Sequence, residues 1–438
     1  MIKNIARSLD GLMKKYTPDP LIYALILTAL VFLMGSLLEG QSLVKVANYW
    51  GTGFWALNNF TLQMVMILLL GYVVALSQPI QWLLSRLANI PKTLCGAAAF
   101  ATFISLVGCF VNWGFGLIIS ALFCKELGKK FHGRGFSILV ASSYSGFLVW
   151  HGGLSGSIPL VVSTPGNFNE AQLGGLVPLS ATIFSGLNLS IVALHFLLLP
   201  ALAYFLMRQS DQASSKISDD DEIKAAIVIT NTPADKLENS QLINILVVLI
   251  GLSYIFSSIL SGGFQVDLDK INFVLFIMAL ALHKTPRAFI NACQKASSKI
   301  WPILVQYPLY AGIMAIMQKS GLGGLLSLFF VDFASAKSFP LLVFFSSGLI
   351  NIFIPSGGGQ WAVQGPMVID AAHALGANIN ATMMAVAWGD SWTNMIQPFW
   401  ALPLLSIAGL KAKDIMGSLL FVLVLSGLII SSCFLIYA

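Results

Sequence analysis

Two stretches in the second half of the chain combine the residue types that bind small ions inside a membrane. Residues 355–361 read Pro-Ser-Gly-Gly-Gly-Gln-Trp, and residues 388–394 read Trp-Gly-Asp-Ser-Trp-Thr-Asn. Both lie among apolar segments, where a helix break survives only if its backbone polar groups are buried in protein or line a wet cavity. A restarting helix presents a partial positive charge suited to an anion, and an ending helix presents carbonyl groups suited to a cation. The pattern predicts a site that binds a small anion together with a cation.

Two breaks in the first half, at residues 112–114 and 151–156, are predicted to converge on the same place. The four breaks offer hydroxyl and amide groups for carboxylate oxygens, and indole rings for a short alkyl tail. The candidate residues for binding the anion are Asn112, Trp113, His151, Ser155, Ser356, Gly357, Gly358, Gly359, Gln360, Trp361, Ser391, Trp392 and Asn394. The candidate ligands for a sodium ion are Asp390, Asn112, Ser356 and Thr393. For each tryptophan, interfacial anchoring or plain packing is an equal alternative.

Asp390 and His151 are the ionisable residues within these breaks. An ionised aspartate at the bilayer centre costs about 2.5–3.5 kcal/mol on insertion scales, so Asp390 is a functional candidate by default. The alternative is a helix N-cap that serves the restart of its own broken helix. His151 suits a proton carrier, a donor to a substrate carboxylate, or a purely structural hydrogen bond.

The composition is that of a helical integral membrane protein. The 438 residues are 57% hydrophobic and 10% charged, with a mean hydropathy of +0.83. The formal net charge of +6 comes from basic residues spread between apolar runs, so nucleic acid is not an expected partner. Five cysteines without a CxxC pair indicate neither a metal site nor a disulfide framework. No tightly bound cofactor is predicted.

The apolar runs predict an all-α protein with about nine transmembrane helices and two re-entrant hairpins. The arms of the hairpin at residues 339–375 are too short for a bilayer core, which needs about 20 residues. The first hairpin of the chain is predicted at residues 93–131, so the hairpin at 339–375 is the second, and broken spans are predicted at 135–162 and 378–407. The unbroken spans are residues 21–38, 62–78, 177–207, 242–260, 271–282, 303–318 and 415–437. Surface helices are expected at residues 41–49, 80–87 and 322–333.

Charge asymmetry sets the orientation of this layout. With the N-terminus in the cytoplasm, all but four of the 24 Lys and Arg residues fall in cytoplasmic segments. The exceptions are Lys45, Lys270, Lys319 and Lys337. This agrees with the positive-inside rule and predicts a multi-pass membrane protein with a cytoplasmic N-terminus and, after nine spans, a C-terminus on the opposite side of the membrane. Residues 1–15 are expected to form an interfacial helix rather than a cleaved signal peptide.

The chain divides into two halves that repeat one order of elements. The halves are residues 1–207 and 241–438, joined by a polar cytoplasmic linker at 208–240. Asn112 precedes His151 by 39 positions, and Asn351 precedes Asp390 by the same interval. An odd number of crossings separates the two units, so the second unit is predicted to be inverted. Inverted repeats whose broken helices meet at the midplane are typical of secondary transporters.

The motif at residues 355–366, Pro-Ser-Gly-Gly-Gly-Gln-Trp-Ala-Val-Gln-Gly-Pro, resembles that of the bacterial short-chain fatty acid transporters, which include acetoacetate and butyrate permeases. The segment at 388–398, Trp-Gly-Asp-Ser-Trp-Thr-Asn-Met-Ile-Gln-Pro, carries the same resemblance, which extends over essentially the whole chain. It implies import of a carboxylate across the inner membrane, driven by protons or sodium. A more distant similarity to the ion-transporter superfamily implies a homodimer with scaffold domains and elevator-like transport domains.

The coupling cation is expected to be sodium. A small carboxylic acid has a pKa of about 4, so its anion must enter against an inside-negative potential and needs an accompanying positive charge. The neutral oxygens of the breaks, together with the carboxylate of Asp390, suit a hard cation. Proton coupling is the alternative, through His151 or a desolvated Asp390.

An intramembrane serine protease is the rival from another class. Residues 153–156 match a GxSG motif and residues 372–376 match AHxxG, which would pair Ser155 with His373 as nucleophile and base. The motifs are short and lie more than 200 positions apart, in different repeats, so this function is disfavoured. A channel is also disfavoured, because nothing forms a continuous ring of pore-lining residues.

Overall fold

The computed structural model describes residues 20–210, 232–261, 266–322, 333–352, 354–396 and 400–437. Within these ranges the chain forms helices and contains no β-strand. Most of the linker predicted at 208–240, the surface helix at 322–333 and the N-terminal interfacial helix lie outside the described residues. The all-α prediction is confirmed.

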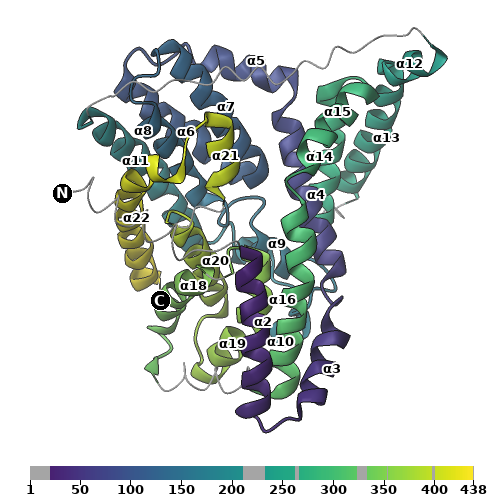
Figure 1. Cartoon of the computed structure of the whole chain (residues 1–438), viewed down its shortest axis with the longest axis vertical. Helices are drawn as coiled ribbons and strands as arrows, with labels where there is room; N and C mark the ends of the chain where they lie inside the picture. The colour runs from purple at the N-terminus through teal and green to yellow at the C-terminus, as the bar shows by residue number, and fades with distance from the viewer. Residues whose placement is uncertain are drawn as a thin grey trace.

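One group of helices forms a scaffold in front and to the right in Figure 1. Its members are α2 (Pro20–Leu37), α3 (Leu43–Gly53), α4 (Asn58–Ala75), α13 (Gln241–Leu260), α14 (Leu268–His283) and α16 (Trp301–Ser320). Helix α16 packs against α2 and α3, and α14 packs against α4 and α13. Gly53 and Gly312 permit the close approach of α3 to α16, because a Cβ at either position would overlap Ala315 or Trp50. We call this group the scaffold body.

The other group contains the helices that surround the predicted breaks, and we call it the core body. Its first half comprises α6 (Leu94–Val111), α7 (Trp113–Lys130), α8 (Phe136–Ser145), η1 (Gly146–Val149), α9 (Ser157–Ser163) and α11 (Gly186–Arg208). Its second half comprises α18 (Phe339–Asn351), α19 (Gly357–Leu375), α20 (Ile379–Thr393), α21 (Ala401–Ala408) and α22 (Met416–Tyr437). Helix α6 packs against α7, α8 and α11, and α18 packs against α19, α20 and α22.

Short elements complete the described chain. Two amphipathic helices at the upper end of Figure 1, α5 (Gln78–Leu87) and α15 (Pro286–Ser297), follow α4 and α14. The remaining elements are α10 (Glu170–Leu173), η2 (Leu179–Ala181), α12 (Pro233–Glu238) and η3 (Ala412–Asp414). The surface helices predicted at 41–49 and 80–87 correspond to α3 and α5.

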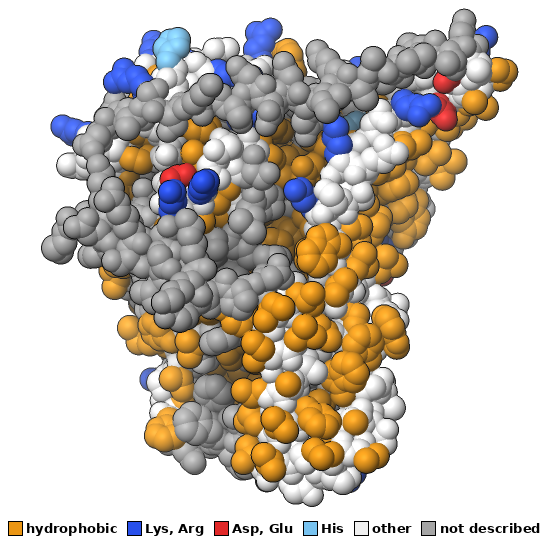
Figure 2. All heavy atoms as spheres, viewed as in Figure 1, with side chains coloured by type: hydrophobic (Ala, Val, Ile, Leu, Met, Phe, Trp, Pro, Cys, Tyr) orange, Lys and Arg blue, Asp and Glu red, His pale blue; other side chains and the backbone are white. Residues whose placement is uncertain are grey.

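Several helices are apolar enough to cross a membrane. Five of the described helices meet the requirement by length and composition, and a sixth does if α15 and α16, bent by 53°, form one span. The shorter apolar helices are Leu21–Leu37, Phe136–Val149 and Phe339–Asn351. Figure 2 shows hydrophobic side chains over the lower part of the visible face and Lys and Arg near its upper end. A membrane protein is therefore supported, whereas the predicted count of nine spans is not established.

The helix breaks occur close to their predicted places, with one correction. Asn112 separates α6 from α7, and α18 ends at Asn351 before α19 begins at Gly357. Residues 150–156 separate η1 from α9. The break predicted at 389–394 was placed too early, because α20 continues through Thr393. Asp390 therefore lies in the last turn of an ending helix. It does not cap a restarting one, since its carboxylate bonds to His151 and not to the backbone of its own chain segment.

Candidate functional site

The tip of the first hairpin is fastened to the first broken helix. Asn112 has an extended backbone between α6 and α7, and its Oδ1 accepts the N–H of Phe115 at 2.8 Å. The N–H of Trp113 donates to Oγ of Ser155 at 2.9 Å. The Nδ2 group of Asn112 is buried and has no partner among the described residues. This tip therefore keeps one amide donor available.

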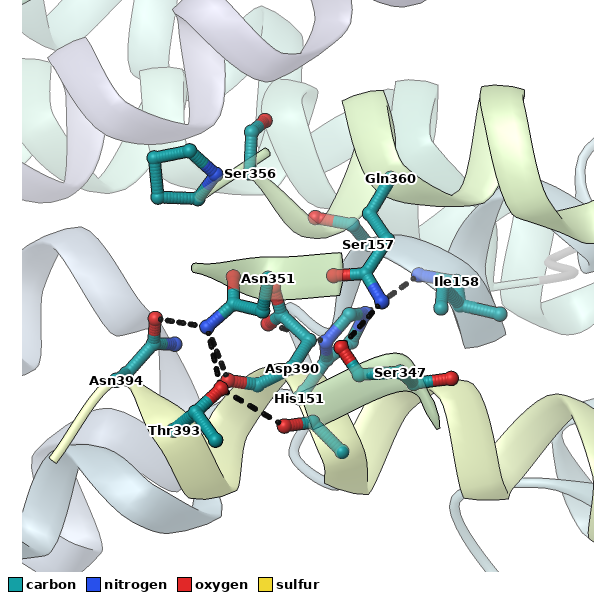
Figure 3. Close-up of polar contacts among 12 residues, drawn as sticks. His151, Ser157, Ile158, Ser347, Asn351, Ser356, Gln360, Asp390, Thr393 and Asn394 are labelled. Atoms are coloured by element: carbon teal, nitrogen blue, oxygen red, sulfur yellow. Dashed lines mark hydrogen bonds and ion pairs between the residues drawn. The ribbon is translucent and has the colours of Figure 1, made fainter. Parts of the chain in front are cut away.

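The tip of the second hairpin lies against the scaffold body. Ser356 caps α19, where its Oγ accepts the N–H of Gly359 at 3.4 Å. The same hydroxyl donates to the phenol oxygen of Tyr307 in α16 at 2.9 Å. Figure 3 shows Ser356 at the start of this hairpin arm, across from Asp390. The contact joins the core body to the scaffold body at the centre of the molecule.

The three glycines of this tip permit the close approach of large rings. A Cβ on Gly357 would overlap the imidazole of His151, and one on Gly358 would overlap the ring of Phe60 in α4. A Cβ on Gly359 would press on the ring of Tyr310 in α16. The Gly-Gly-Gly sequence is thus explained by sterics on both sides of the hairpin.

His151 and Asp390 meet in the buried centre, although 239 positions separate them (Figure 3). The imidazole Nδ1 lies 3.1 Å from Oδ2 of Asp390, and neither side chain is exposed. The other ring nitrogen, Nε2, accepts the backbone N–H of Ile158 at 3.1 Å. Because a backbone amide only donates, this network assigns the neutral tautomer in which Nδ1–H donates to Asp390. His151 is therefore uncharged in this arrangement.

Asp390 consequently lacks a positive partner among the described residues. Its second oxygen, Oδ1, is buried and has no hydrogen-bond partner in the described part of the chain. A buried ionised carboxylate without a compensating charge costs several kcal/mol or takes up a proton. The geometry thus calls for either a metal cation or a proton at this carboxylate.

A cluster of oxygens surrounds the amide of Asn351 beside Asp390 (Figure 3). Nδ2 of Asn351 donates to the carbonyl of Asp390 at 2.9 Å, to Oγ1 of Thr393 at 3.0 Å and to Oδ1 of Asn394 at 3.0 Å. Oδ1 of Asn351 is buried without a partner among the described residues. Amide O and N positions are assigned from such networks. A flipped Asn351 would add its own oxygen to these three, which is a hard-oxygen set suited to a cation.

The tentative sodium ligands do not all come together. Asp390 and Thr393 belong to the cluster around Asn351, whereas Asn112 lies against Gly71 of α4 and Ser356 lies against Tyr307. No group of three or more His, Cys, Asp or Glu side chains that could hold a metal occurs in the described chain. A cation at this place would depend mainly on neutral oxygens.

Four aromatic rings from different segments of the core body form a closed cycle beside these breaks. Trp113 contacts Trp150 and Trp400, with ring centroids 5.8 Å and 5.1 Å apart. Phe147 completes the cycle, at 5.6 Å from Trp150 and 6.2 Å from Trp400. We call Trp113, Phe147, Trp150 and Trp400 the aromatic cage. The indole N–H of Trp400 donates to the carbonyl of Pro355 at 2.9 Å, which ties the cage to the tip of the second hairpin.

The cage borders a small cavity between the two bodies. Its other walls are Ser157, Ser356 and Gly357 from the core body and Met64, Ile303 and Tyr307 from the scaffold body. The cavity volume is about 10 Å³, which is room for about one water molecule. The indole N–H groups of Trp113 and Trp150 are buried without a partner among the described residues. The cavity thus has mainly aromatic walls, and two of the tryptophans that line it carry indole N–H groups without a described acceptor.

Comparisons with known proteins fit this architecture. The family model described as short chain fatty acid transporter matches residues 1–437. A relative from Escherichia coli (strain K12) is 40% identical over 433 residues, covering 98% of each chain. One from Haemophilus influenzae is 40% identical over 427 residues, covering 95% of this chain and 96% of its own. Both carry the provisional name of a short-chain fatty acid transporter.

The chain belongs to the short-chain fatty acid transporter family. The resemblance drawn from the two sequence motifs is confirmed. Among solved structures, the crystal structure of the YdaH transporter of Alcanivorax borkumensis has a TM-score of 0.59 at 16% sequence identity, and the match covers 95% of this chain and 98% of that one. This similarity supports the fold alone.

Membership of the transporter family agrees with the expectation that the chain is no enzyme. The geometry also separates the two protease-like motifs of this family member. Ser155 is fully buried in the break of the first broken helix, whereas His373 is exposed and its Nε2 lies 3.2 Å from the carbonyl of Gln172. The pairing of Ser155 with His373 was therefore a wrong alternative.

Other predicted residues of this transporter take part in packing inside the core body. Trp392 packs on Phe344 and donates its N–H to the carbonyl of Leu423, so it faces α18 and α22. The side-chain amide of Gln360 donates to the carbonyl of Ser347 and joins the two arms of the second hairpin. Trp361 and Ser391 are buried, with no partner for their polar atoms among the described residues. None of these four lines the small cavity.

Sequence reasoning missed Phe147, Trp150, Trp400, Tyr307 and Met64, which this family member places around the cavity. Trp150 directly precedes His151, so extending the first broken segment by one residue would have found it. Tyr307 lies within a continuous helix of the scaffold body and carries no local signal. Contacts across the two bodies are not encoded in the spacing of a single segment.

Proposed function

We propose that this protein is a secondary active transporter that imports short-chain monocarboxylates, such as butyrate and acetoacetate, together with a cation. The observation that carries the proposal is the cavity between the two bodies, which is lined by the aromatic cage, and two of the cage tryptophans, Trp113 and Trp150, have indole N–H groups without an acceptor among the described residues. A short alkyl tail gains from contact with aromatic walls, and a carboxylate accepts N–H donors. Family membership and the names of the two relatives support this substrate class.

An elevator-like mechanism is the corresponding proposal for movement. The cavity draws its walls from both bodies, so displacement of the core body against the scaffold body would open it. A vestibule of about 940 Å³ on one side includes Lys125, Lys129 and Lys295, and one of about 280 Å³ on the other includes Met314 and Asp370. Alternating access through a fixed site in repeated halves is the general scheme of such carriers. Basic side chains in the larger vestibule suit an anionic substrate.

The packing of the two halves supports the proposed inverted repeat, residues 1–207 and 241–438. In the first half α6 contacts α8 and α11, and in the second half α18 contacts α20 and α22. Each second hairpin arm packs on a scaffold helix, α7 on α4 and α19 on α16. The contacts between the halves follow the same relation. The helix after the break of each broken helix contacts the second hairpin arm of the other half, α21 on α7 and α9 on α19.

Sodium is the cation we propose, with the proton as the alternative. The oxygen cluster around Asn351 and the unpartnered Oδ1 of Asp390 support a hard cation. A proton would reside on Asp390, because His151 already accepts an amide hydrogen at Nε2. Import with at least one cation removes the cost of moving a negative charge against the membrane potential, about 2.3 kcal/mol per 100 mV.

The proposed setting is the bacterial inner membrane, with a cytoplasmic N-terminus, a periplasmic C-terminus and a homodimeric assembly. The distribution of Lys and Arg in the sequence supports the orientation. Exposed apolar side chains on α13, such as Leu249 and Ile250, suit contact with lipid or with a second subunit.

Uptake into proteoliposomes tests the function. The purified protein is reconstituted, and entry of labelled butyrate or acetoacetate is followed under imposed sodium gradients, proton gradients or neither. Saturable uptake above the equilibrium level in a sodium gradient is the expected result. Flux that never saturates would indicate a channel, and uptake that follows only the pH gradient would replace sodium with the proton. Absence of uptake for every short-chain acid would overturn the substrate class.

A further inference from the structure

Three of the four rings of the aromatic cage are buried, and the fourth, Trp400, is partly buried. Each of its four rings contacts the next, and Phe147 lies parallel to Trp150 with an interplanar angle of 7°. Trp113 and Trp150 are buried at 4% and 3% exposure, and Phe147 at 1%. Met64 of α4 faces the cage from the scaffold body, where its sulfur accepts the hydroxyl of Ser157 at 3.4 Å.

These walls differ in how firmly they are held. Trp400 is tied to the second hairpin by its hydrogen bond to Pro355, and Trp150 stacks on His151 with centroids 4.2 Å apart. Trp113 follows the helix cap at Asn112. Phe147 has only packing contacts, with Tyr144, Trp150 and Trp400. Phe147 is therefore the wall of the cage that no described hydrogen bond or helix cap holds, and a smaller side chain at this position would enlarge the cage.

We propose that the aromatic cage selects substrates by the length of their alkyl tail, with Phe147 as the residue that sets the limit. This inference rests on the proposed function and assigns the tail to a defined set of rings. Protein interiors are close-packed, so a tail longer than the cage accepts must displace a ring. Movement of the scaffold wall, which carries Met64, Ile303 and Tyr307, provides the room for a short tail.

The donors at the cage favour an anion over the quaternary ammonium group that aromatic boxes also bind. The N–H groups of Trp113 and Trp150 need acceptors, and a quaternary ammonium has none to offer. A carboxylate or a keto oxygen provides them. Choline therefore serves as a discriminating competitor, and it is expected not to inhibit carboxylate uptake.

The test compares a series of straight-chain acids from acetate to octanoate in proteoliposomes of the wild type, Phe147→Leu and Phe147→Ala. Each buried methylene is worth about fourfold in binding, so removal of the ring is expected to raise the hexanoate-to-butyrate ratio of kcat/KM by about 10-fold or more. Phe123→Leu is the matched control, because Phe123 is fully buried in α7 and packs on Phe100 away from the cage. Its chain-length profile should equal that of the wild type.

The outcomes separate this inference from the proposed function. A wild type that carries butyrate while Phe147→Leu and Phe147→Ala keep the wild-type profile would overturn the role of the cage and leave the function standing. A wild type that carries no monocarboxylate would overturn both. Phe147→Leu retains most of the packing volume and gives the answer if Phe147→Ala does not fold, as judged by size exclusion in detergent. Competition by choline would overturn the anion assignment.

Discussion

At the scale of single residues, the pair of His151 and Asp390 combines a neutral imidazole with a buried carboxylate that has no described positive partner. The amide of Ile158 holds Nε2 of His151 without a proton, and Nδ1–H occupies one oxygen of Asp390. The other oxygen of Asp390 remains for a cation or a proton. The histidine thus orients the carboxylate, and we propose that this carboxylate is the group that responds to a coupling ion.

Replacing Asp390 by asparagine is expected to abolish the dependence of uptake on the sodium gradient. The amide is neutral and no longer needs a cation. The stimulation of butyrate uptake by sodium should therefore fall at least 10-fold. His151→Gln should retain sodium stimulation with weaker uptake, because glutamine can still donate to Asp390. Stimulation is measured as the ratio of initial uptake rates with and without the gradient.

Asp267→Asn is the control for this substitution. Asp267 caps α14 through Oδ1, and asparagine caps helices about as well as aspartate. Undiminished sodium stimulation in Asp390→Asn would place the cation elsewhere. Uptake that ignores sodium, follows pH and disappears in His151→Gln would favour proton coupling.

The unpartnered indole of Trp150 leads to a second prediction at this scale. Trp150→Phe keeps a ring over His151 but removes the N–H group, so the KM for butyrate should rise by about 10-fold to 100-fold. A hydrogen bond to a charged group contributes about 1.5–3 kcal/mol. Trp50→Phe is the control, because Trp50 also has a buried N–H without a described partner but lies in α3 of the scaffold body. An equal KM in all three proteins would contradict the assignment.

At the scale of elements, the second hairpin determines how the two bodies meet. Its glycine tip runs across Phe60 of α4 and Tyr310 of α16, with Tyr307 bonded to Ser356. The first hairpin is connected differently to α5. At the end of α7, Nζ of Lys130 donates to the carbonyls of Ala88, Asn89 and Pro91, which follow α5. Close, largely apolar contact at the tip is compatible with sliding, whereas the three hydrogen bonds of Lys130 are compatible with a fixed joint.

A methyl group on the glycine tip should therefore block transport. Gly358→Ala and Gly359→Ala would overlap Phe60 and press on Tyr310, and overpacking of this kind costs typically about 1–3 kcal/mol. Uptake is expected to fall at least 10-fold, while the melting temperature drops by only a few degrees.

Gly51→Ala in α3 has open space around its Cβ and serves as the control, with wild-type uptake expected. Full activity of Gly358→Ala would show that the aromatic surface beneath the tip yields freely. Loss of the folded protein in both tip variants would assign the glycines to stability instead of movement.

At the scale of the whole molecule, the proposed movement requires contacts between the bodies to break. One such contact joins the N–H of Leu268, at the start of α14, to Oγ1 of Thr164, which follows α9 in the core body, at 3.3 Å. Phe60 and Phe168 form another, with centroids 5.7 Å apart. The vestibules on either side of the interface differ in volume, about 940 Å³ against 280 Å³.

Joining the bodies covalently should therefore stop uptake. In a variant without its five native cysteines, new cysteines at Thr164 and Leu268 are linked by a short cleavable cross-linker, and butyrate uptake is measured before and after. Linkage is expected to reduce uptake to background, and cleavage to restore it. The control pair is Gln63 and Asn272, which are hydrogen-bonded within the scaffold body. Uptake that survives complete linkage of 164 to 268 would exclude an elevator-like displacement.

The sequence by itself determined the membrane class, the helical breaks and the family. Hydropathy is a sum over local residues, and a run such as Gly357–Gly359 between apolar segments marks a break without reference to the rest of the chain. The same local information identified Asn112, His151, Ser356 and Asp390 as candidate site residues. These decisions concern single segments, whose conformational preferences depend mainly on neighbouring residues.

Only the tertiary structure decided which of these residues meet. His151 and Asp390 lie 239 positions apart, and the cage unites Trp113 with Trp400 through packing that no periodicity encodes. In the structure Trp392 faces α22, and α20 continues past Asp390. The physical reason is that a buried polar group takes whichever partner the folded chain brings within hydrogen-bond distance, and side-chain packing between distant segments makes that choice.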